Sequence, residues 1–185
     1  MDELDIDDLI TSEDPEERLE AWEDETWTPT PEQVLIGLND EDDDVRYAVW
    51  CRTDWSPTEA QIEQGLEDDF QVREAIWQRD DWTPSPAIVE DSLSRDEDVR
   101  DSIWCRTDWS PSMDQVEKYG LADEFAAVRL AVWRRNDWQP SHKHFDFAAR
   151  DSDERVRAAA AERAHQTLKS KQSEITSPNP EISAL

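Results

Sequence analysis

One thirteen-residue stretch recurs along the chain and constrains its fold more than any other feature. It reads V-R-Y-A-V-W-C-R-T-D-W-S-P from Val45. Three near copies begin at Val72, Val99 and Val128. A degraded copy begins at Glu17, and a truncated copy begins at Val156. In chain order the starts are spaced by 28, 27, 27, 29 and 28 residues. Such a period is typical of repeat proteins, in which each unit buries its apolar face by stacking on its neighbours.

Each repeat is expected to form a pair of helices. In the helix that carries the signature, Val45, Ala48 and Val49 share one face by the 3.6-residue period. Arg46 and Trp50 are four residues apart, so the guanidinium is predicted to lie on the indole. This arginine is also expected to pair with an acidic residue of a neighbouring repeat.

The other helix of each pair is predicted to begin at the sequence Ser-Pro or Thr-Pro. In the unit at Val45, Ser56 is the expected N-cap, with Pro57 at the first helical position and Glu59 completing a capping box. The fifth residue after each proline is apolar and is predicted to face inward: Val34, Ile62, Val89, Val116 and Phe145.

These patterns predict an all-α fold, an α-solenoid of about five to six repeats of 27–29 residues, spanning residues 13–172. Residues 1–12 alternate acidic and aliphatic side chains. They are interpreted as a cap on the first repeat or as an acidic-hydrophobic peptide that docks on a partner. Residues 173–185 have no period and two prolines, and are expected to be a disordered tail.

The repeat pattern resembles the variant leucine-rich repeats, a bacterial relative of HEAT-like helical repeats, over roughly residues 15–160. The Val-Arg pairs at 45–46, 72–73, 99–100, 128–129 and 156–157 carry it, with Pro57, Pro84 and Pro111. The resemblance implies a right-handed superhelical scaffold that binds other macromolecules, and no particular activity. This chain departs from the pattern in two ways: it inserts tryptophans where small residues are usual, and it lacks a cysteine cluster for an iron–sulfur centre.

Charge is the main functional signal. The formal net charge is −28, and it is uneven: residues 1–128 hold 39 acidic and 9 basic residues, whereas residues 129–185 hold 8 and 10. A field of this sign repels nucleic acid and anionic membranes and attracts basic proteins. Solubility or salt adaptation is the plainer explanation. Part of the acidity also favours the dipoles of the helices that it precedes.

The sequence therefore predicts a non-enzymatic acidic module that binds a basic partner, such as a nuclease, a toxin or a nucleic-acid-binding protein. In its sharpest form it is a nucleic-acid mimic or an immunity-type inhibitor. The alternatives are an adaptor that binds a peptide or subunit without charge mimicry and, less favoured by the charge, a HEAT-like DNA-modifying enzyme.

The repeat-bound carboxylates Asp54, Asp81, Asp108 and Asp137 are expected to neutralise arginines. Surplus carboxylates in the inter-helix turns are the predicted partner-binding residues: Asp40, Asp42, Asp43, Asp44, Glu67, Asp68, Asp69, Asp96, Glu97, Asp98, Asp123 and Glu124. Reversing Asp42, Asp43, Asp68, Asp69 and Asp98 to lysine is expected to abolish binding and to leave folding intact.

The tryptophans form two sets. Trp50, Trp77, Trp104 and Trp133 are predicted to seal the joints between repeats. The second set, Trp55, Trp82, Trp109 and Trp138, is expected to be half exposed, and its first three members are candidate contacts for a protein partner.

No catalytic motif, cofactor motif or metal-spaced set stands out. His142, His144 and Asp146 are interpreted as ordinary exposed residues. Cys51 and Cys105 are predicted to be small core residues beyond disulfide reach, as in a reducing cytosol. No apolar run reaches membrane length, so we expect a soluble cytoplasmic protein.

Overall fold

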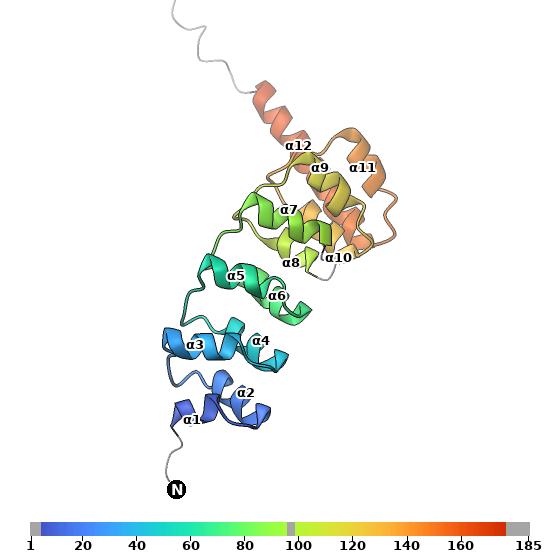
Figure 1. Ribbon diagram of the computed structural model, residues 1–185. Helices are drawn as coiled ribbons and strands as arrows, with labels where there is room; N and C mark the ends of the chain where they lie inside the picture. Colours follow the sequence, from blue (N-terminus) through green and yellow to red (C-terminus); the bar gives the residue numbers. More distant parts are fainter. Residues whose placement is uncertain (1–4, 96–98, 177–185) are drawn as a thin grey trace, which may run out of the picture. The chain divides into compact units, whose positions relative to one another are not determined.

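The computed structural model describes residues 5–95 and 99–176, and these residues form helices and connecting turns with no strand (Figure 1). The all-α prediction is confirmed. The chain divides into two compact units, Met1–Trp109 and Ser110–Leu185, called unit 1 and unit 2 below. Unit 1 holds α1 (Ile6–Ile10), α2 (Pro15–Glu23), α3 (Pro31–Leu38), α4 (Asp43–Cys51), α5 (Glu59–Gly65), α6 (Phe70–Gln78), α7 (Pro86–Arg95) and α8 (Arg100–Cys105). Unit 2 holds α9 (Met113–Gln115), the π-helical turn η1 (Val116–Leu121), α10 (Ala126–Arg134), α11 (His142–Ala148) and α12 (Glu154–Thr176).

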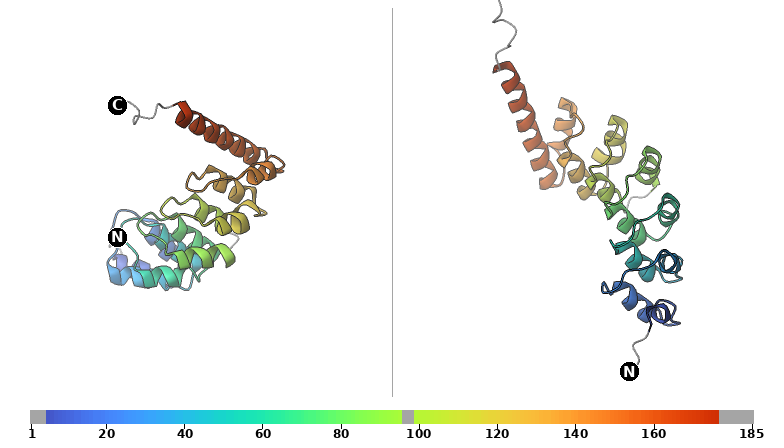
Figure 2. Two further views of the ribbon diagram at one scale, coloured as in Figure 1. Left: turned by 90° about the horizontal axis from the view of Figure 1, so that it is seen from above. Right: turned by 90° about the vertical axis from the view of Figure 1, so that its left-hand side faces the viewer.

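Within unit 1 the helices are arranged in pairs. The helices with the V-R signature, α4, α6 and α8, pack against α3, α5 and α7 respectively. Helices α2, α4, α6 and α8 also contact one another in succession, so the pairs follow one another along the unit (Figures 1 and 2). Within unit 2, α10 packs against η1 and α12, and α11 packs against α12.

The core consists of the side chains that the 3.6-residue period predicts to face inward. In α4, Val45, Val49 and Trp50 are almost fully buried. The predicted inward residues of the other helices are buried too, except that Phe145 is half-buried. The joint tryptophans Trp50, Trp77, Trp104 and Trp133 are buried as predicted.

Each joint tryptophan packs against the tryptophan five residues later. Ring centroids are 5.2–5.3 Å apart in the five pairs, 22/27, 50/55, 77/82, 104/109 and 133/138. The neighbouring helix approaches the first indole very closely. A Cβ atom at Gly37 would lie 2.6 Å from the Trp22 ring and 2.5 Å from Val49, and one at Gly65 would lie 2.8 Å from Trp50. Glycine is therefore required there for packing space.

The predicted position of the N-caps is wrong by two residues. In α5 the cap is Thr58, whose hydroxyl accepts from the Gln61 N–H, and the Gln61 side chain accepts the Thr58 N–H at 2.8 Å. Capping boxes also stand at Thr30, Ser112 and Ser141. The preceding Ser-Pro or Thr-Pro segment, such as Ser56-Pro57, lies outside the helix.

The predicted contact of Arg46 with the Trp50 indole is also wrong. Arg46 instead forms a bidentate pair with Asp68, 22 residues later, at 2.7–2.8 Å. Arg18 binds Asp40 and Arg129 binds Asp151 at the same spacing. The predicted ion pair with a neighbouring repeat is thus confirmed, while Trp50 is buried in the core.

The arginine that does lie on an indole is the one after the tryptophan. The Arg52 guanidinium lies 4.9 Å from the Trp27 ring centroid and donates to the carbonyl oxygens of Trp22 and Trp27 at 2.9 and 2.6 Å. Its other edge forms a bidentate pair with Asp54. Arg79 and Arg106 repeat this arrangement. The last carbonyls of one helix, which lack helical partners, are thus satisfied by the next repeat.

The structure adds detail at both ends of the predicted repeat domain. Helix α1 packs against α2 and α3 and buries Ile10, so part of the 1–12 segment belongs to the folded unit. Helix α12 continues to Thr176, so the predicted boundary at 172 falls within a helix. The rest of the predicted tail, 177–185, lies outside the described residues.

Candidate functional site

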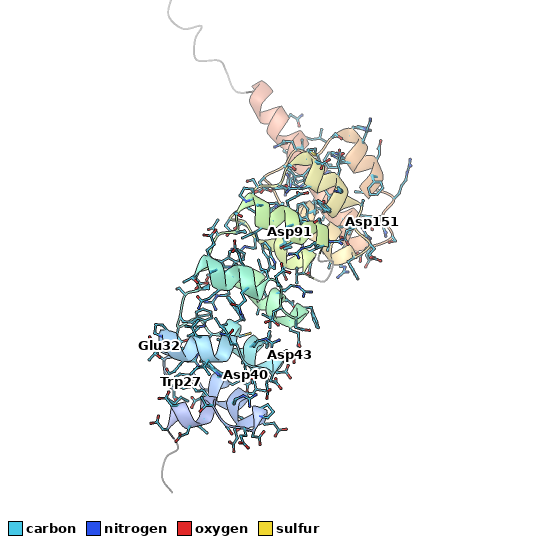
Figure 3. All side chains as sticks on the ribbon, in the orientation of Figure 1. Trp27, Glu32, Asp40, Asp43, Asp91 and Asp151 are labelled. Atoms are coloured by element: carbon cyan, nitrogen blue, oxygen red, sulfur yellow. The ribbon has the colours of Figure 1, made fainter. Side chains whose placement is uncertain are left out.

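The acidic turn between α3 and α4 is the first part of the predicted partner-binding set. The Asp40 carboxylate accepts from Arg18 Nε and Nη2, both at 2.8 Å, and from the Asp42 N–H at 2.9 Å. Its side chain is only 5% exposed. The hydrogen bonds that Arg18 donates to Asp40 raise the pKa of Arg18. Asp40 is therefore a structural residue whose charge is already balanced, not part of a surplus (Figure 3).

Asp42 has a second structural role in the same turn. It is the N-cap of α4, and its carboxylate accepts from the Asp44 N–H at 3.0 Å. Asp43 and Asp44 follow it in the first turn of the helix, and both side chains are exposed. Of the four predicted residues in this turn, these two remain available to a partner.

The turn between α5 and α6 repeats this division. Burial opposes ionisation of Asp68, but the hydrogen bonds from Arg46 and from the Asp69 N–H hold the pKa of its carboxyl below the usual value. Asp69 is the N-cap of α6 and accepts from the Gln71 N–H at 3.0 Å. Glu67 is exposed, and Arg95 contacts it at 2.9 Å.

In unit 2, Asp123 is also structural. It is 6% exposed and accepts from the Phe125 N–H at 2.8 Å. Glu124 is exposed, although its backbone carbonyl accepts from Arg129. The remaining predicted residues, Asp96, Glu97 and Asp98, lie outside the described residues.

The charge-reversal prediction needs the same correction. Lysine at position 68 would replace the bidentate partner of Arg46, and lysine at 42 or 69 would remove a helix cap. Folding would not be left intact by these changes, because a broken buried pair and a lost cap both destabilise.

The second set of tryptophans is less exposed than predicted. Trp82 is 9% exposed, and Trp138 is buried as well, whereas Trp55 and Trp109 are half-buried. Each indole N–H donates at 2.9–3.0 Å to the carbonyl six residues earlier. The expectation that this set is half exposed is therefore wrong for Trp82 and Trp138, and the polar edge of every ring is already bonded.

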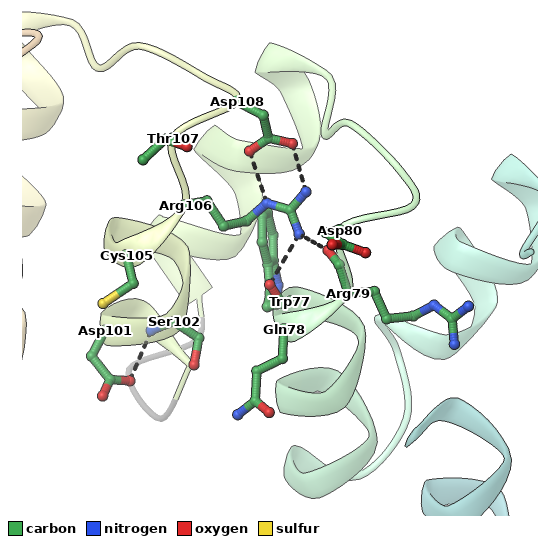
Figure 4. A pocket seen from close by; sticks show the side chains of 10 residues that line it. All are labelled: Trp77, Gln78, Arg79, Asp80, Asp101, Ser102, Cys105, Arg106, Thr107 and Asp108. Atoms are coloured by element: carbon green, nitrogen blue, oxygen red, sulfur yellow. Dashed lines mark hydrogen bonds and ion pairs between the residues drawn. The ribbon is translucent and has the colours of Figure 1, made fainter. Parts of the chain in front are cut away.

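A pocket of about 400 Å³ lies beside α6 and α8 (Figure 4). Cys105 lines it, and both Cys105 and Cys51 are exposed, so the prediction that they are core residues is wrong. Each follows its buried tryptophan at the last helical position, where the chain turns away from the core. The arginines in the pocket wall, Arg79 and Arg106, are held by Asp81 and Asp108.

The paired arginines confirm the predicted role of the repeat-bound aspartates. Arg52, Arg79, Arg106 and Arg135 bind Asp54, Asp81, Asp108 and Asp137 at 2.5–2.7 Å. The hydrogen bond from Arg52 holds the pKa of Asp54 below its usual value. Charge in the joints is thus balanced locally.

The arrangement of possible metal ligands and the hydropathy of the helices can be stated for the part of the chain that the structure describes. It contains no group of three or more His, Cys, Asp or Glu side chains arranged to hold a metal ion. His142 contacts Asp146, and His144 contacts Glu117, each at 3.0 Å. No helix in the described ranges, 5–95 and 99–176, is both long and apolar enough to cross a membrane.

No family model, curated protein or solved structure matches this chain. The resemblance to variant leucine-rich repeats therefore stays a prediction.

Proposed function

We propose that this chain is a non-enzymatic module that binds a basic protein through carboxylates exposed on unit 1. We also propose that its repeats form a right-handed solenoid of the variant leucine-rich or HEAT-like kind. The recurring contacts support this second proposal, because Arg18, Arg46 and Arg129 each reach an aspartate 22 residues later. A cytoplasmic location belongs to the same proposal.

The observation that carries the binding proposal is the excess of acidic side chains over lysine and arginine side chains in unit 1. Residues 1–109 contain 35 acidic and 8 basic residues, a formal charge of −27. Arg18, Arg46, Arg52, Arg79 and Arg106 are each held in a bidentate pair with one aspartate. The pairs use few of the carboxylates, so the remaining negative charge acts on approaching ions and proteins.

The set of proposed contact residues is smaller than the set that the sequence predicted. Within unit 1 they are Asp43, Asp44 and Glu67, which are exposed. Glu124 is a candidate in unit 2. Asp96, Glu97 and Asp98 stay candidates on the sequence alone. Asp40, Asp68 and Asp123 are withdrawn because their carboxylates are bound within the fold, and Asp42 and Asp69 because they cap helices.

Capture of basic proteins from a host lysate on the immobilised chain, over a series of salt concentrations, tests the proposal. Binding should fall steeply between low and moderate salt, because screening weakens exposed charge pairs. The variant D43N/D44N/E67Q should retain less partner than the wild type. The matched control, D146N/E154Q/E162Q, removes the same charge from exposed positions in unit 2 and should bind as the wild type does.

Binding that survives moderate salt would overturn the charge-based proposal and favour an adaptor without mimicry. Equal losses in the two triple variants would show that total charge, rather than these positions, decides binding. Direct binding of DNA at low salt would support the enzyme alternative instead, because that reading requires contact with nucleic acid.

A further inference from the structure

A groove of about 760 Å³ lies between α3 and α5 in unit 1. Pro29, Pro31 and Leu35 line it from the α3 side. Trp55 and Ala60 line it from the α5 side, and polar side chains extend that wall: Gln61 and Gln64. The groove is thus mainly apolar, although it lies in the strongly acidic unit. Its volume is within the range of pockets that bind small molecules or side chains.

Leu35 distinguishes α3 from the corresponding helices of the other repeats. The position five residues after the capping Ser or Thr is acidic in every other repeat: Glu63, Glu90, Glu117 and Asp146. Only α3 has an aliphatic side chain there, and that side chain is 50% exposed. At the first position after the cap, α3 has Pro31 and α7 has Pro86, whereas α5 has Glu59.

The fold does not account for this leucine. The core of α3 is formed by Val34, Leu38 and Gly37, all of which are buried. An acidic side chain serves at the same position in the other helices, so packing does not require a leucine. Leu35 therefore belongs to an apolar wall, with the exposed Pro31 and the half-buried Trp55, that packing within α3 does not explain.

The surroundings of the groove favour a cationic occupant. None of the described residues that line the groove is a lysine or an arginine. Asp54 lines it and is held by Arg52, and the Arg79 guanidinium on the ring of Trp55 is held by Asp81. Glu32 and Glu59 are exposed in the first turns of α3 and α5, the two helices that form the groove. An apolar side chain flanked by positive charges complements an apolar groove with exposed carboxylates beside it.

We infer that the α3–α5 groove receives an apolar side chain, of the size of leucine, from a basic segment of the partner. This inference rests on the proposed function and adds to it the part of the partner that is recognised. The lysines or arginines on either side of the anchor interact with the surrounding carboxylates. The anchor itself contacts Leu35, Pro31 and the ring of Trp55.

Synthetic peptides test the inference without knowledge of the partner. The probes are acetyl-Lys-Lys-Leu-Lys-Lys-amide, the same peptide with serine for leucine, and the leucine peptide with glutamine for every lysine. Amide NMR shifts of the full chain report the affinity and the place of binding. The leucine peptide should bind about tenfold more tightly than the serine peptide, since burying an aliphatic side chain favours binding by this order or more. Its shifts should gather at the groove residues, such as Leu35, Ala60 and Gln64.

A pair of neutral variants provides the matched control. Leu35→Gln removes the apolar wall without changing charge, and a polar residue at this position is compatible with the helix, as Glu63 shows in α5. Ile36→Gln makes the same change at the next residue, which is 43% exposed and does not line the groove. The preference for leucine over serine should disappear in Leu35→Gln and persist in Ile36→Gln.

The outcomes separate this inference from the proposed function. If both lysine peptides bind equally and lose affinity with salt, the groove inference is wrong and the charge-based function stands. If the glutamine peptide binds as tightly as the lysine–leucine peptide, the groove is an apolar site that does not select a basic partner. If no lysine peptide binds at low salt, both are overturned.

Discussion

Units 1 and 2 build their joints with the same parts but carry very different charge. Each has a paired arginine and aspartate 22 residues apart, Arg46–Asp68 in unit 1 and Arg129–Asp151 in unit 2. Tilted tryptophan pairs occur in unit 1, such as Trp50–Trp55, and one such pair, Trp133–Trp138, occurs in unit 2. Unit 1 has a formal charge of −27, whereas residues 110–185 hold 12 acidic and 11 basic residues, a charge of −1. The joint therefore does not require the excess acidity, and another cause must be sought for it.

The units also differ in how completely an arginine closes the joint. In unit 1, Arg79 donates to the carbonyls of Trp50, Arg52 and Trp55 and binds Asp81. In unit 2, Arg163 of α12 donates to the carbonyl of Trp138 at 2.7 Å, and its Nη1 is buried with no hydrogen-bond partner among the described residues. Burial lowers the pKa of Arg163.

Replacing these two arginines should give the largest difference between the units. Arg79→Ala leaves three carbonyls and the Asp81 carboxylate without their partner, so we expect a loss of about 3–5 kcal/mol. Arg163→Ala removes one such bond and relieves an unsatisfied group, and should cost about 1–2 kcal/mol. Urea unfolding followed by tryptophan fluorescence measures both.

Arg95→Ala is the control for the loss of a positive charge from unit 1. Arg95 is exposed and contacts Glu67 and Asp91, a setting in which ion pairs contribute little. Its unfolding midpoint should stay near that of the wild type. An equal loss in Arg79→Ala and Arg95→Ala would mean that net charge, rather than the carbonyl contacts, stabilises the joint.

A smaller effect is expected where glycine meets the joint tryptophan. Gly37→Ala places a Cβ atom 2.5 Å from Val49 and 2.6 Å from Trp22, and overpacking of this kind costs about 1–3 kcal/mol. The better helix propensity of alanine offsets up to about 1 kcal/mol of that. Unit 2 has Ala148 at the corresponding position, so Ala148→Gly should not stabilise it. Chemical denaturation of both variants checks the contrast.

Much of the joint could be predicted from the sequence because it depends on periodicity within one repeat. The inward face of α4 and the pairing of Arg52 with Asp54 need only local spacing. The contact of the Arg52 guanidinium with the Trp27 ring could not be predicted in this way, because the two residues belong to different repeats and meet only when the helices pack. For the same reason the spacing predicts that Arg46 pairs with an acidic residue of a neighbouring repeat but does not identify that residue as Asp68.

The capping residues show how two local signals compete. Ser56 and Thr58 are both capping residue types, and each has a Glu or Gln three residues later. The extended segment between Trp55 and Thr58 is set by tertiary contacts, since the Trp55 carbonyl accepts from Arg79 and the ring packs on Trp50. The helix therefore begins at the second signal. A useful clue was available, because Ser or Thr occurs at this second position in every repeat.

Thr30→Ala tests this assignment with an effect of about 1 kcal/mol, the usual value of a capping hydroxyl. The Thr30 hydroxyl accepts from the Gln33 N–H, and the Gln33 side-chain oxygen accepts from the Thr30 N–H at 2.7 Å. Thr28→Ala changes the exposed residue before Pro29 and should leave the unfolding midpoint unchanged. Ser112→Ala makes the corresponding change in unit 2, where the Ser112 hydroxyl accepts from the Gln115 N–H at 3.2 Å, and it should cost a similar amount.

The smallest effect is expected from added salt, which tests the difference in formal charge between unit 1 and unit 2 through their hydrogen-exchange protection. Raising the NaCl concentration screens repulsion among the exposed carboxylates of unit 1, while the largely buried arginine pairs are screened much less. Amide hydrogen exchange measured on peptides from each unit should show slightly higher protection in unit 1 and no change in unit 2. Lower protection in unit 1 would mean that its exposed ion pairs outweigh the repulsion. The surplus acidity would then stabilise the fold, and the main argument for a basic partner would be lost.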